Sequence, residues 1–197
     1  MDVEETKIPG VLILKPKVFG DQRGWFMESW QSDRYASLGL PQRFVQDNQA
    51  FSERGVLRGL HIQNPFGQGK LVQVIRGEVF DVAVDVRKDS PWFGQWVGVH
   101  LSESNHHQFY VPVGFAHGYL VLSEEAIFSY KCSDYYHPET QFSVRWDDPE
   151  IGIDWPSDLS PLLAEKDRDA PLLSEVATEM LPLYQPEGSS SSESSIS

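Results

Sequence analysis

Residues 70–87, KLVQVIRGEVFDVAVDVR, decide the fold, because apolar and polar side chains alternate along them with a period of two. Successive side chains of an extended strand point to opposite faces, so this period is typical of β structure. In the second half, one face carries Phe80, Val82, Val84 and Val86, and the other carries Val79, Asp81, Ala83 and Asp85. Gly77 interrupts the run and predicts a hairpin turn between two strands.

Short apolar stretches on both sides of this segment continue the pattern. They predict further strands near residues 11–15, 44–52, 56–63, 95–102, 108–114, 119–123 and 126–136. Short strands at regular spacing indicate an antiparallel β-sandwich or barrel.

Helices have little place in this arrangement. One short helix is expected near residues 33–38, with Ser32 as its N-cap and Gly39 as its stop, and short turns are expected near 160–168. Turn residues at the corners of the sandwich would be Pro112, Gly114 and Gly118. The sequence therefore predicts a mostly β jelly roll with a few short helices.

The length of 197 residues suits one domain with a sizeable core and is short for two. We expect residues 1–184 to form that single domain. Residues 185–197, QPEGSSSSESSIS, are polar and low in complexity, so they cannot bury apolar surface and predict a disordered tail.

The chain is strongly acidic, with a formal net charge of -13. Such a surface repels nucleic acids and anionic membranes, so neither is an expected partner. A phosphorylated ligand would need a local basic pocket that works against this field. Arginine and lysine side chains inside apolar segments are therefore informative.

Several features favour a cytoplasmic location. Cys132 is the single cysteine, so the chain forms no internal disulfide framework, and we expect Cys132 to be a small core residue rather than a nucleophile. The first ten residues, MDVEETKIPG, lack the apolar core of a signal peptide. No apolar run approaches the about 18 residues that a membrane span requires.

Common nucleotide and nucleophile motifs are absent from the sequence. No G-x-G-x-x-G follows a strand, and no G-x-S-x-G is present. The segment GQGKL fails as a phosphate loop, because Asn64 stands where the first glycine belongs and Leu71 stands where serine or threonine is needed.

A metal site is half complete. Jelly rolls often bind a metal through a His-x-His pair, a carboxylate and a later histidine. Here the pair reads His61-Ile62-Gln63, and glutamine is a poor ligand beside histidine. The later element, PVGFAH from Pro112 to His117, is intact. Because the first half is broken, no bound metal is expected.

A basic residue interrupts the apolar strand VLRGLHIQ, residues 56–63. On a regular strand the side chains divide between two faces, with Arg58, Leu60 and Ile62 on one and Gly59, His61 and Gln63 on the other. Gly59 or a local twist would let Arg58 reach the side of His61. A guanidinium in this position needs a partner, which is either a carboxylate in an ion pair or a diphosphate.

At this point the whole chain from about Ile8 to Leu173 resembles the dTDP-4-dehydrorhamnose 3,5-epimerases of the cupin superfamily. The resemblance rests on nine motifs in order: PKVFGDQRGWFMES, FVQDN, GVLRGLHIQ, GQGKLVQVIRGEVFDVAVDVR, SPWFGQWVGV, VPVGFAHGY, YKCSDYY, DDPEIGIDWP and AEKDRDAPLL. Each motif alone is weak, but their order and spacing exclude chance.

The resemblance implies a role for each matched residue. His61 matches the catalytic base, Asp167 its carboxylate partner, Tyr130 the acid, and Lys70 the residue beside the keto oxygen. Diphosphate contacts are implied for Arg23 and Arg58. Residues that match the nucleotide and sugar pocket are Phe19, Glu28, Gln46, Asn48, His117 and Tyr136. His117 is expected to line the same cavity as His61.

The reaction that the resemblance implies inverts C3 and C5 of dTDP-4-dehydro-6-deoxy-D-glucose, giving dTDP-4-dehydro-L-rhamnose in dTDP-L-rhamnose biosynthesis. Both carbons adjoin the C4 ketone, so the site needs a base, an oxyanion donor and an acid on the opposite face. The ketone is already present, so no cofactor is expected. The family also implies a homodimer, with VLILK, residues 11–15, as an edge strand exchanged between subunits.

Three alternatives remain open from the sequence. The chain could epimerise C3 or C5 only, on this or a related nucleotide sugar. It could be a metal-dependent cupin oxygenase, which metal analysis would reveal. It could also bind a sugar nucleotide without catalysis, although intact His61, Lys70, Tyr130 and Asp167 argue against this.

Overall fold

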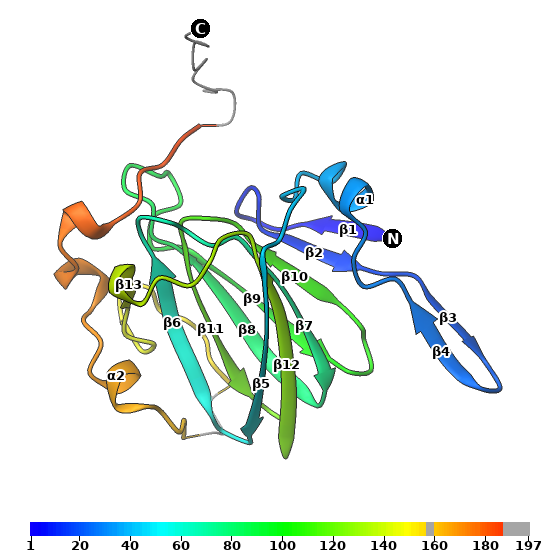
Figure 1. Cartoon of the computed structure of the whole chain (residues 1–197). Helices are drawn as coiled ribbons and strands as arrows, with labels where there is room; N and C mark the ends of the chain where they lie inside the picture. The colour runs from blue at the N-terminus through cyan, green and yellow to red at the C-terminus, as the bar shows by residue number, and fades with distance from the viewer. Residues whose placement is uncertain (157–159, 187–197) are drawn as a thin grey trace, which may run out of the picture.

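The computed structural model describes residues 1–156 and 160–186, in which two antiparallel sheets face each other as a sandwich (Figure 1). The six-stranded sheet has the order β1 (Asp2–Glu5), β2 (Leu12–Lys15), β10 (Gln108–Val111), β7 (Lys70–Arg76), β12 (Glu125–Cys132) and β5 (Gln46–Glu53). The five-stranded sheet has the order β13 (Gln141–Ser143), β6 (Leu57–Gln63), β11 (Phe115–Val121), β8 (Glu78–Asp85) and β9 (Trp96–Ser102). The predicted mostly β jelly roll is confirmed.

Little of the described chain is helical, as expected. The two α-helices are α1 (Ser32–Ala36) and α2 (Glu165–Arg168), and single 3-10 turns cover Pro138–Thr140, Leu173–Glu175 and Thr178–Met180. Ser32 was expected to be the N-cap of α1, but Gln31 takes that place, because its side-chain oxygen accepts a hydrogen bond from the backbone N–H of Arg34. Within the described ranges, no helix has the length and apolar character needed to cross a bilayer.

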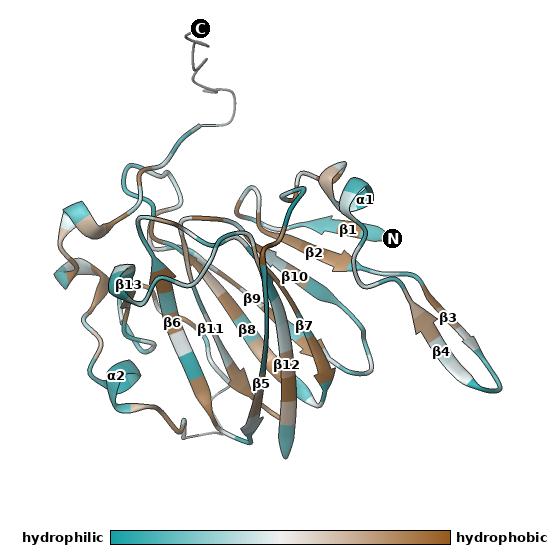
Figure 2. Ribbon diagram, viewed as in Figure 1, coloured by the Kyte–Doolittle hydropathy of each residue, from teal (hydrophilic) through white to brown (hydrophobic). Residues whose placement is uncertain are grey.

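Three apolar clusters pack on the two sheets, and Figure 2 shows hydrophobic residues along many of the strands. Between the sheets lies a core that includes Val72, Phe109 and Phe128 from one sheet and Val79 and Leu101 from the other. The outer face of the five-stranded sheet is covered by the chain after β13, and the outer face of the six-stranded sheet packs against the region around α1. Both faces of each sheet are thus covered over part of their length, which explains why β8 is buried on both sides.

The prediction of a hairpin at Gly77 was wrong. β7 pairs with β10 and β12, whereas β8 pairs with β11 and β9, so Gly77 carries the chain from one sheet to the other. Its φ is 81°, and a Cβ at this position would lie 2.1 Å from the carbonyl oxygen of Glu125. Alternation predicts strands but cannot tell a hairpin from a crossing between sheets.

Other expectations also need correction. Pro112 and Gly114 lie at the corner between β10 and β11, but Gly118 lies inside β11, where its backbone packs closely on Gly59. The stretch 11–15 is not an edge strand, because β2 pairs with both β1 and β10 of its own chain. Residues 187–197, which hold most of the predicted disordered tail, lie outside the described part of the chain.

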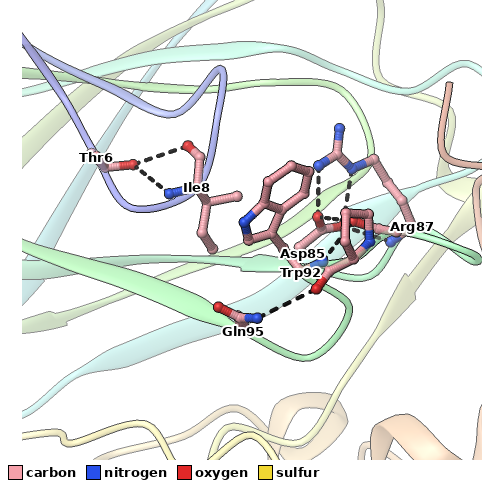
Figure 3. Close-up of polar contacts among 8 residues, drawn as sticks. Thr6, Ile8, Asp85, Arg87, Trp92 and Gln95 are labelled. Carbon is pink, nitrogen blue, oxygen red and sulfur yellow. Dashed lines mark hydrogen bonds and ion pairs between the residues drawn. The ribbon is translucent and has the colours of Figure 1, made fainter. Parts of the chain in front are cut away.

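A buried ion pair fastens the turn after β8 (Figure 3). The Arg87 guanidinium donates to both carboxylate oxygens of Asp85, at 2.9 and 2.6 Å, and the Ser90 hydroxyl donates to the same carboxylate at 2.7 Å. Arg87 also stacks between the rings of Phe115 and Tyr184. The pair therefore ties β8, the start of β11 and the C-terminal segment together.

A two-stranded hairpin, β3 (Val18–Asp21) and β4 (Gly24–Met27), projects away from both sheets (Figure 1). The sequence analysis did not predict these strands. Several of its aromatic side chains are more than half exposed, at 55% for Phe19, 59% for Trp25 and 69% for Phe26. An arm with so much exposed aromatic surface is poorly covered by its own chain.

Candidate active site

A cavity of about 280 Å³ opens between the two sheets at one end of the sandwich. Six residues singled out in the sequence line it: Gln46, Asn48, His61, Lys70, Tyr130 and Tyr136. Residues that lie far apart in the sequence thus meet in one place. The reason is the register of the strands, which can be followed residue by residue.

The wall from the six-stranded sheet comes from β5, β12 and β7. Tyr130 pairs with Asn48 on β5 and with Val72 on β7, while Cys132 pairs with Gln46 and Lys70. Because side chains two residues apart share a face, Tyr130, Asn48, Gln46 and Lys70 all point the same way as the core residue Val72. Period-2 geometry therefore delivers the phenol and the amine to the same wall.

The opposite wall comes from β6. Leu60 and Ile62 belong to the outer core of the five-stranded sheet, so His61 between them points inward. The imidazole of His61 and the phenol of Tyr130 therefore enter the cavity from opposite sheets. A ring bound between them would present one face to each group.

His61 is held by Asp167, which is supplied by α2. His61 Nε2 lies 2.7 Å from Asp167 Oδ1, and the backbone N–H of Gly59 donates to Asp167 Oδ2 at 3.4 Å. The Asp167 side chain is 3% exposed and that of His61 is 24% exposed. With Nε2–H donating to the carboxylate, Nδ1 is the ring nitrogen that keeps a free lone pair.

Burial sets the protonation of this pair. Desolvation lowers the pKa of His61 below its ordinary value, and the bond to Asp167 opposes this shift only in part. Desolvation raises the pKa of Asp167, but the hydrogen bond and the charge of His61 outweigh it, so the net shift is downward. A neutral imidazole beside a carboxylate is the combination that a general base at neutral pH requires.

The groups on the other wall are suited to donate hydrogen. Desolvation raises the pKa of Tyr130 to about 12, so its phenol keeps its proton at neutral pH. Burial lowers the pKa of Lys70, against the opposing attraction of Cys132 and Asp81. In either protonation state its Nζ carries N–H groups that can reach an oxygen in the cavity.

Arg58 reaches the His61 side of β6 through a bulge. His117 on β11 pairs with His61, but Tyr119, two residues later, pairs with Arg58, three residues away from His61. The extra residue in β6 brings Arg58 and His61 to one face. Arg58 donates to the Ser52 hydroxyl at 3.1 Å, and its charge partly opposes the burial that raises the pKa of Tyr130. No carboxylate bonds to it among the described contacts, so the diphosphate interpretation stays open.

His117 was expected to line the cavity, but it is not among the described lining residues. It lies beside His61 on the neighbouring strand β11, and its Nε2 contacts the buried carboxylate of Asp81 at 2.9 Å. The His117 side chain is 7% exposed and that of Asp81 is 0% exposed. Burial raises the pKa of Asp81, although His117 and Lys70 oppose the shift.

Phe19, Arg23 and Glu28 are not brought to the cavity of their own chain. Phe19 and Arg23 stand on the projecting hairpin, where Arg23 bonds to Asp21, and Glu28 follows the hairpin and bonds to Arg34 at 2.7 Å. None of the three is among the described lining residues. The described part of their own chain therefore does not bring them to this cavity.

The cavity also contains residues that the sequence analysis did not assign: Ile62, Gln63, Gln68, Gly114, Phe115, Gln141 and Lys166. In the sequence, Gln63 stands where a metal-binding jelly roll would carry a histidine ligand. Lys166 directly precedes Asp167 in the segment AEKD. Gln63 lies two residues after His61 and Gln68 two residues before Lys70. On an extended chain this spacing places each glutamine on the same face as its neighbour and could have identified both as cavity residues. Gln141, on β13, lies in none of the quoted motifs, so no sequence signal indicated its place in the cavity.

The described residues do not form a metal-ligand cluster, and the environment of Cys132 does not favour a reactive thiolate. Within residues 1–156 and 160–186, no three His, Cys, Asp or Glu side chains converge as a metal ligand set. Cys132 is fully buried, as expected, and burial raises the pKa of its thiol, which disfavours the reactive thiolate.

Comparison with known proteins gives one consistent family. Residues 5–175 match the family described as dTDP-4-dehydrorhamnose 3,5-epimerase. The enzyme of that name from Salmonella typhimurium is 55% identical over 175 residues, which are 88% of this chain and 96% of the relative.

Solved structures agree with the sequence relatives. The dTDP-6-deoxy-D-glucose-3,5-epimerase of Legionella pneumophila, in complex with dTDP-4-keto-L-rhamnose, is 55% identical with a TM-score of 0.91, covering 93% of this chain and 98% of that one. A 3'-monoepimerase of Streptomyces bikiniensis, in complex with dTDP-quinovose, is 36% identical with a TM-score of 0.86, covering 91% and 92%.

Proposed function

Because the chain belongs to the dTDP-4-dehydrorhamnose 3,5-epimerase family, we propose that it inverts C3 and C5 of dTDP-4-dehydro-6-deoxy-D-glucose to give dTDP-4-dehydro-L-rhamnose. The chain is thus an isomerase of nucleotide-sugar biosynthesis. One observation carries the mechanism: His61, steered by Asp167, and Tyr130 enter one cavity from opposite sheets, with Lys70 on the Tyr130 wall.

Proton removal falls to His61. A hydrogen on a carbon next to a ketone is acidic only when the enolate that forms is stabilised, so base and oxyanion donor act together. His61 Nδ1 takes the proton, and the electron pair of the C–H bond moves into the enolate. Asp167 accepts the hydrogen bond from Nε2 and stabilises the imidazolium that results. General-base catalysis of this kind contributes roughly 10²–10⁴-fold.

Lys70 and Tyr130 complete the inversion. Lys70 donates to the C4 oxygen as negative charge develops there, and one such donor is worth about 3–4 kcal/mol in other enzymes. Tyr130 returns a proton to the carbon from the face opposite His61, and solvent reprotonates the phenolate. Inversion then follows from the geometry, because base and acid stand on facing sheets.

The remaining residues of the site bind the nucleotide part of the substrate. Gln46, Asn48 and Tyr136 line the cavity, and Arg58 lies near Tyr130 as a diphosphate contact. We propose a homodimer in which the β3–β4 hairpin reaches the cavity of a second copy and delivers Phe19, Arg23 and Glu28. The exposed aromatic side chains of the arm support this arrangement, and so does the absence of Phe19, Arg23 and Glu28 from the described lining of their own chain's cavity.

Location and organisation extend the proposal. We place the enzyme in the cytoplasm, where the free thiol of Cys132 stays reduced. Residues 1–184 act as one catalytic domain, and residues 185–197 take no part in the chemistry.

The test is incubation with dTDP-4-dehydro-6-deoxy-D-glucose in deuterated water, followed by proton NMR at C3 and C5. Loss of both proton signals with formation of the L-rhamno product supports the proposal. Exchange at C3 alone would make the chain a monoepimerase like the Streptomyces bikiniensis relative.

Variants separate catalysis from binding. His61→Asn is expected to bind dTDP and to exchange neither proton. His100→Asn is the matched control, because this histidine is exposed on β9, where its side chain bonds to Glu78 and packs on Phe80 rather than entering the cavity. Exchange that persists in His61→Asn would refute the assignment of the base.

A further inference from the structure

The segment from Ser133 to His137 follows β12 and forms one rim of the cavity without regular secondary structure. It carries Tyr136, which lines the cavity although the residue is 51% exposed. A segment without strand pairing must satisfy its backbone groups in another way. Here side-chain amides do so.

Gln63 contacts this rim on both sides of Tyr136 and also contacts the loop after β6. Its Nε2 donates to the carbonyl oxygen of Tyr135 at 3.0 Å and to that of Phe66, and its Oε1 accepts from the backbone N–H of His137 at 2.8 Å. The side chain is buried and both ends of the amide are engaged. Gln63 thus clasps the rim on either side of Tyr136.

Two further glutamines hold the same rim, and both line the cavity. Gln46 Oε1 accepts from the backbone N–H of Tyr136 at 3.0 Å, and Gln68 Nε2 donates to the carbonyl oxygen of Asp134 at 2.9 Å. The rings of Phe66 and His137 also stack, with centroids 4.5 Å apart. The loop that follows β6 and the loop that follows β12 are therefore joined as one rim.

We propose that Gln63 is a positioning residue that fixes Tyr136 for binding the nucleotide part of the substrate, by clasping the backbone of the 133–137 rim. The inference rests on the proposed function for its ligand. Gln63 occupies the position at which a metal-binding jelly roll carries the second histidine of its His-x-His pair. Here the side-chain amide at this position holds the rim through hydrogen bonds.

Glutamine suits this place because the rim presents both acceptors and a donor. Two carbonyl oxygens need a donor, and the N–H of His137 needs an acceptor, so a primary amide satisfies all three. Glutamate would set a charge against two carbonyl oxygens, and methionine would leave all three groups without partners. A buried polar group that loses its partner costs about 1–3 kcal/mol.

The test is a double-mutant cycle with Gln63→Met and Tyr136→Ala, with dTDP as the probe in calorimetry. Each single variant is expected to weaken dTDP binding about tenfold. If Gln63 acts through Tyr136, the double variant stays near tenfold weaker. A double variant about a hundredfold weaker, or a Gln63→Met variant within about twofold of wild type, would overturn the proposal.

Turnover gives a second readout that general destabilisation would not produce. In Gln63→Met, the fold increase in KM is expected to be at least about three times the fold decrease in kcat. The reason is that Gln63 positions a binding residue and does not take part in proton transfer at His61. Gln95→Met is the matched control, since this side-chain amide contacts only Pro91 in the described part of the chain. Gln95, drawn in Figure 3, is not among the described residues that line the cavity. Its Kd and KM should equal those of wild type.

Hydrogen–deuterium exchange of the ligand-free protein separates this inference from the proposed function. In Gln63→Met the amide of His137 should exchange about tenfold faster, with β12 unchanged. If wild type neither binds dTDP nor turns over, the proposed function fails, and exchange alone decides whether Gln63 holds the rim. If Gln63→Met does not fold, Gln63→Asn, whose amide is one methylene shorter, replaces it, and unchanged exchange of the His137 amide in that variant refutes the clasp.

Discussion

Replacing Asp167 by asparagine tests how the site holds and charges its base. The bond from His61 Nε2 to Asp167 Oδ1 is 2.7 Å long, and the carboxylate is almost fully buried. A unit charge pair about 4 Å apart at an effective dielectric of 20 is worth about 4 kcal/mol. If half of the imidazolium charge has developed in the transition state, its loss costs about 2 kcal/mol, or about 30-fold in kcat.

The amide also lets the imidazole ring choose the wrong tautomer or orientation, which adds to this loss. The same exchange in the His–Asp pair of serine proteases lowers kcat by about 10⁴. We therefore expect Asp167→Asn to lower kcat by between about 30-fold and 10⁴-fold, with dTDP affinity within about twofold of wild type. Steady-state kinetics and calorimetry measure both quantities.

The pH profile gives the sign of the effect. His61 acts as a base only when neutral, so activity is present above its pKa and is lost as pH falls through it. Burial holds that pKa below about 6.5, and the bond to Asp167 partly opposes the shift. Removal of the carboxylate lowers the pKa further, so the acid limb of kcat/KM must move to lower pH in Asp167→Asn.

Asp169→Asn is the control, because Asp169 is exposed two residues away on the same segment. It should retain the wild-type rate and profile. A loss of less than about threefold in Asp167→Asn, or an acid limb that moves to higher pH, would refute the charge argument.

Three further outcomes are expected. Lys70→Met should lower kcat by about 10²–10³-fold with little change in dTDP affinity, because it removes one oxyanion donor; an effect confined to KM would contradict this role. Tyr130→Phe should still exchange substrate protons with deuterated solvent through His61 but should form far less inverted product by NMR, and full inversion would exclude Tyr130 as the acid. Arg87→Met should lower the free energy of unfolding by about 3 kcal/mol in urea titrations, because it leaves Asp85 buried without its cation, and the loss should shrink in the double variant with Asp85→Asn.

The jelly roll was predictable because its signal is local. Alternation in residues 70–87 identified two strands that the structure places inside the two sheets, each between two paired neighbours. The same signal failed at Gly77, because a turn between paired strands and a crossing between sheets have the same local pattern. It also missed the β3–β4 hairpin, whose exposed aromatic residues gain nothing from burial within the chain.

Residue types and their order determined the family and the chemistry that His61, Asp167, Lys70 and Tyr130 can perform. Only the tertiary structure decided which groups meet. It set His61 and Tyr130 on facing sheets and turned Arg58 to the side of His61 through a bulge. It also paired His117 with the buried Asp81 and engaged Gln63 with the rim. The physical reason is that side-chain chemistry and strand period belong to the local chain, whereas register and sheet partnership arise from contacts between distant residues.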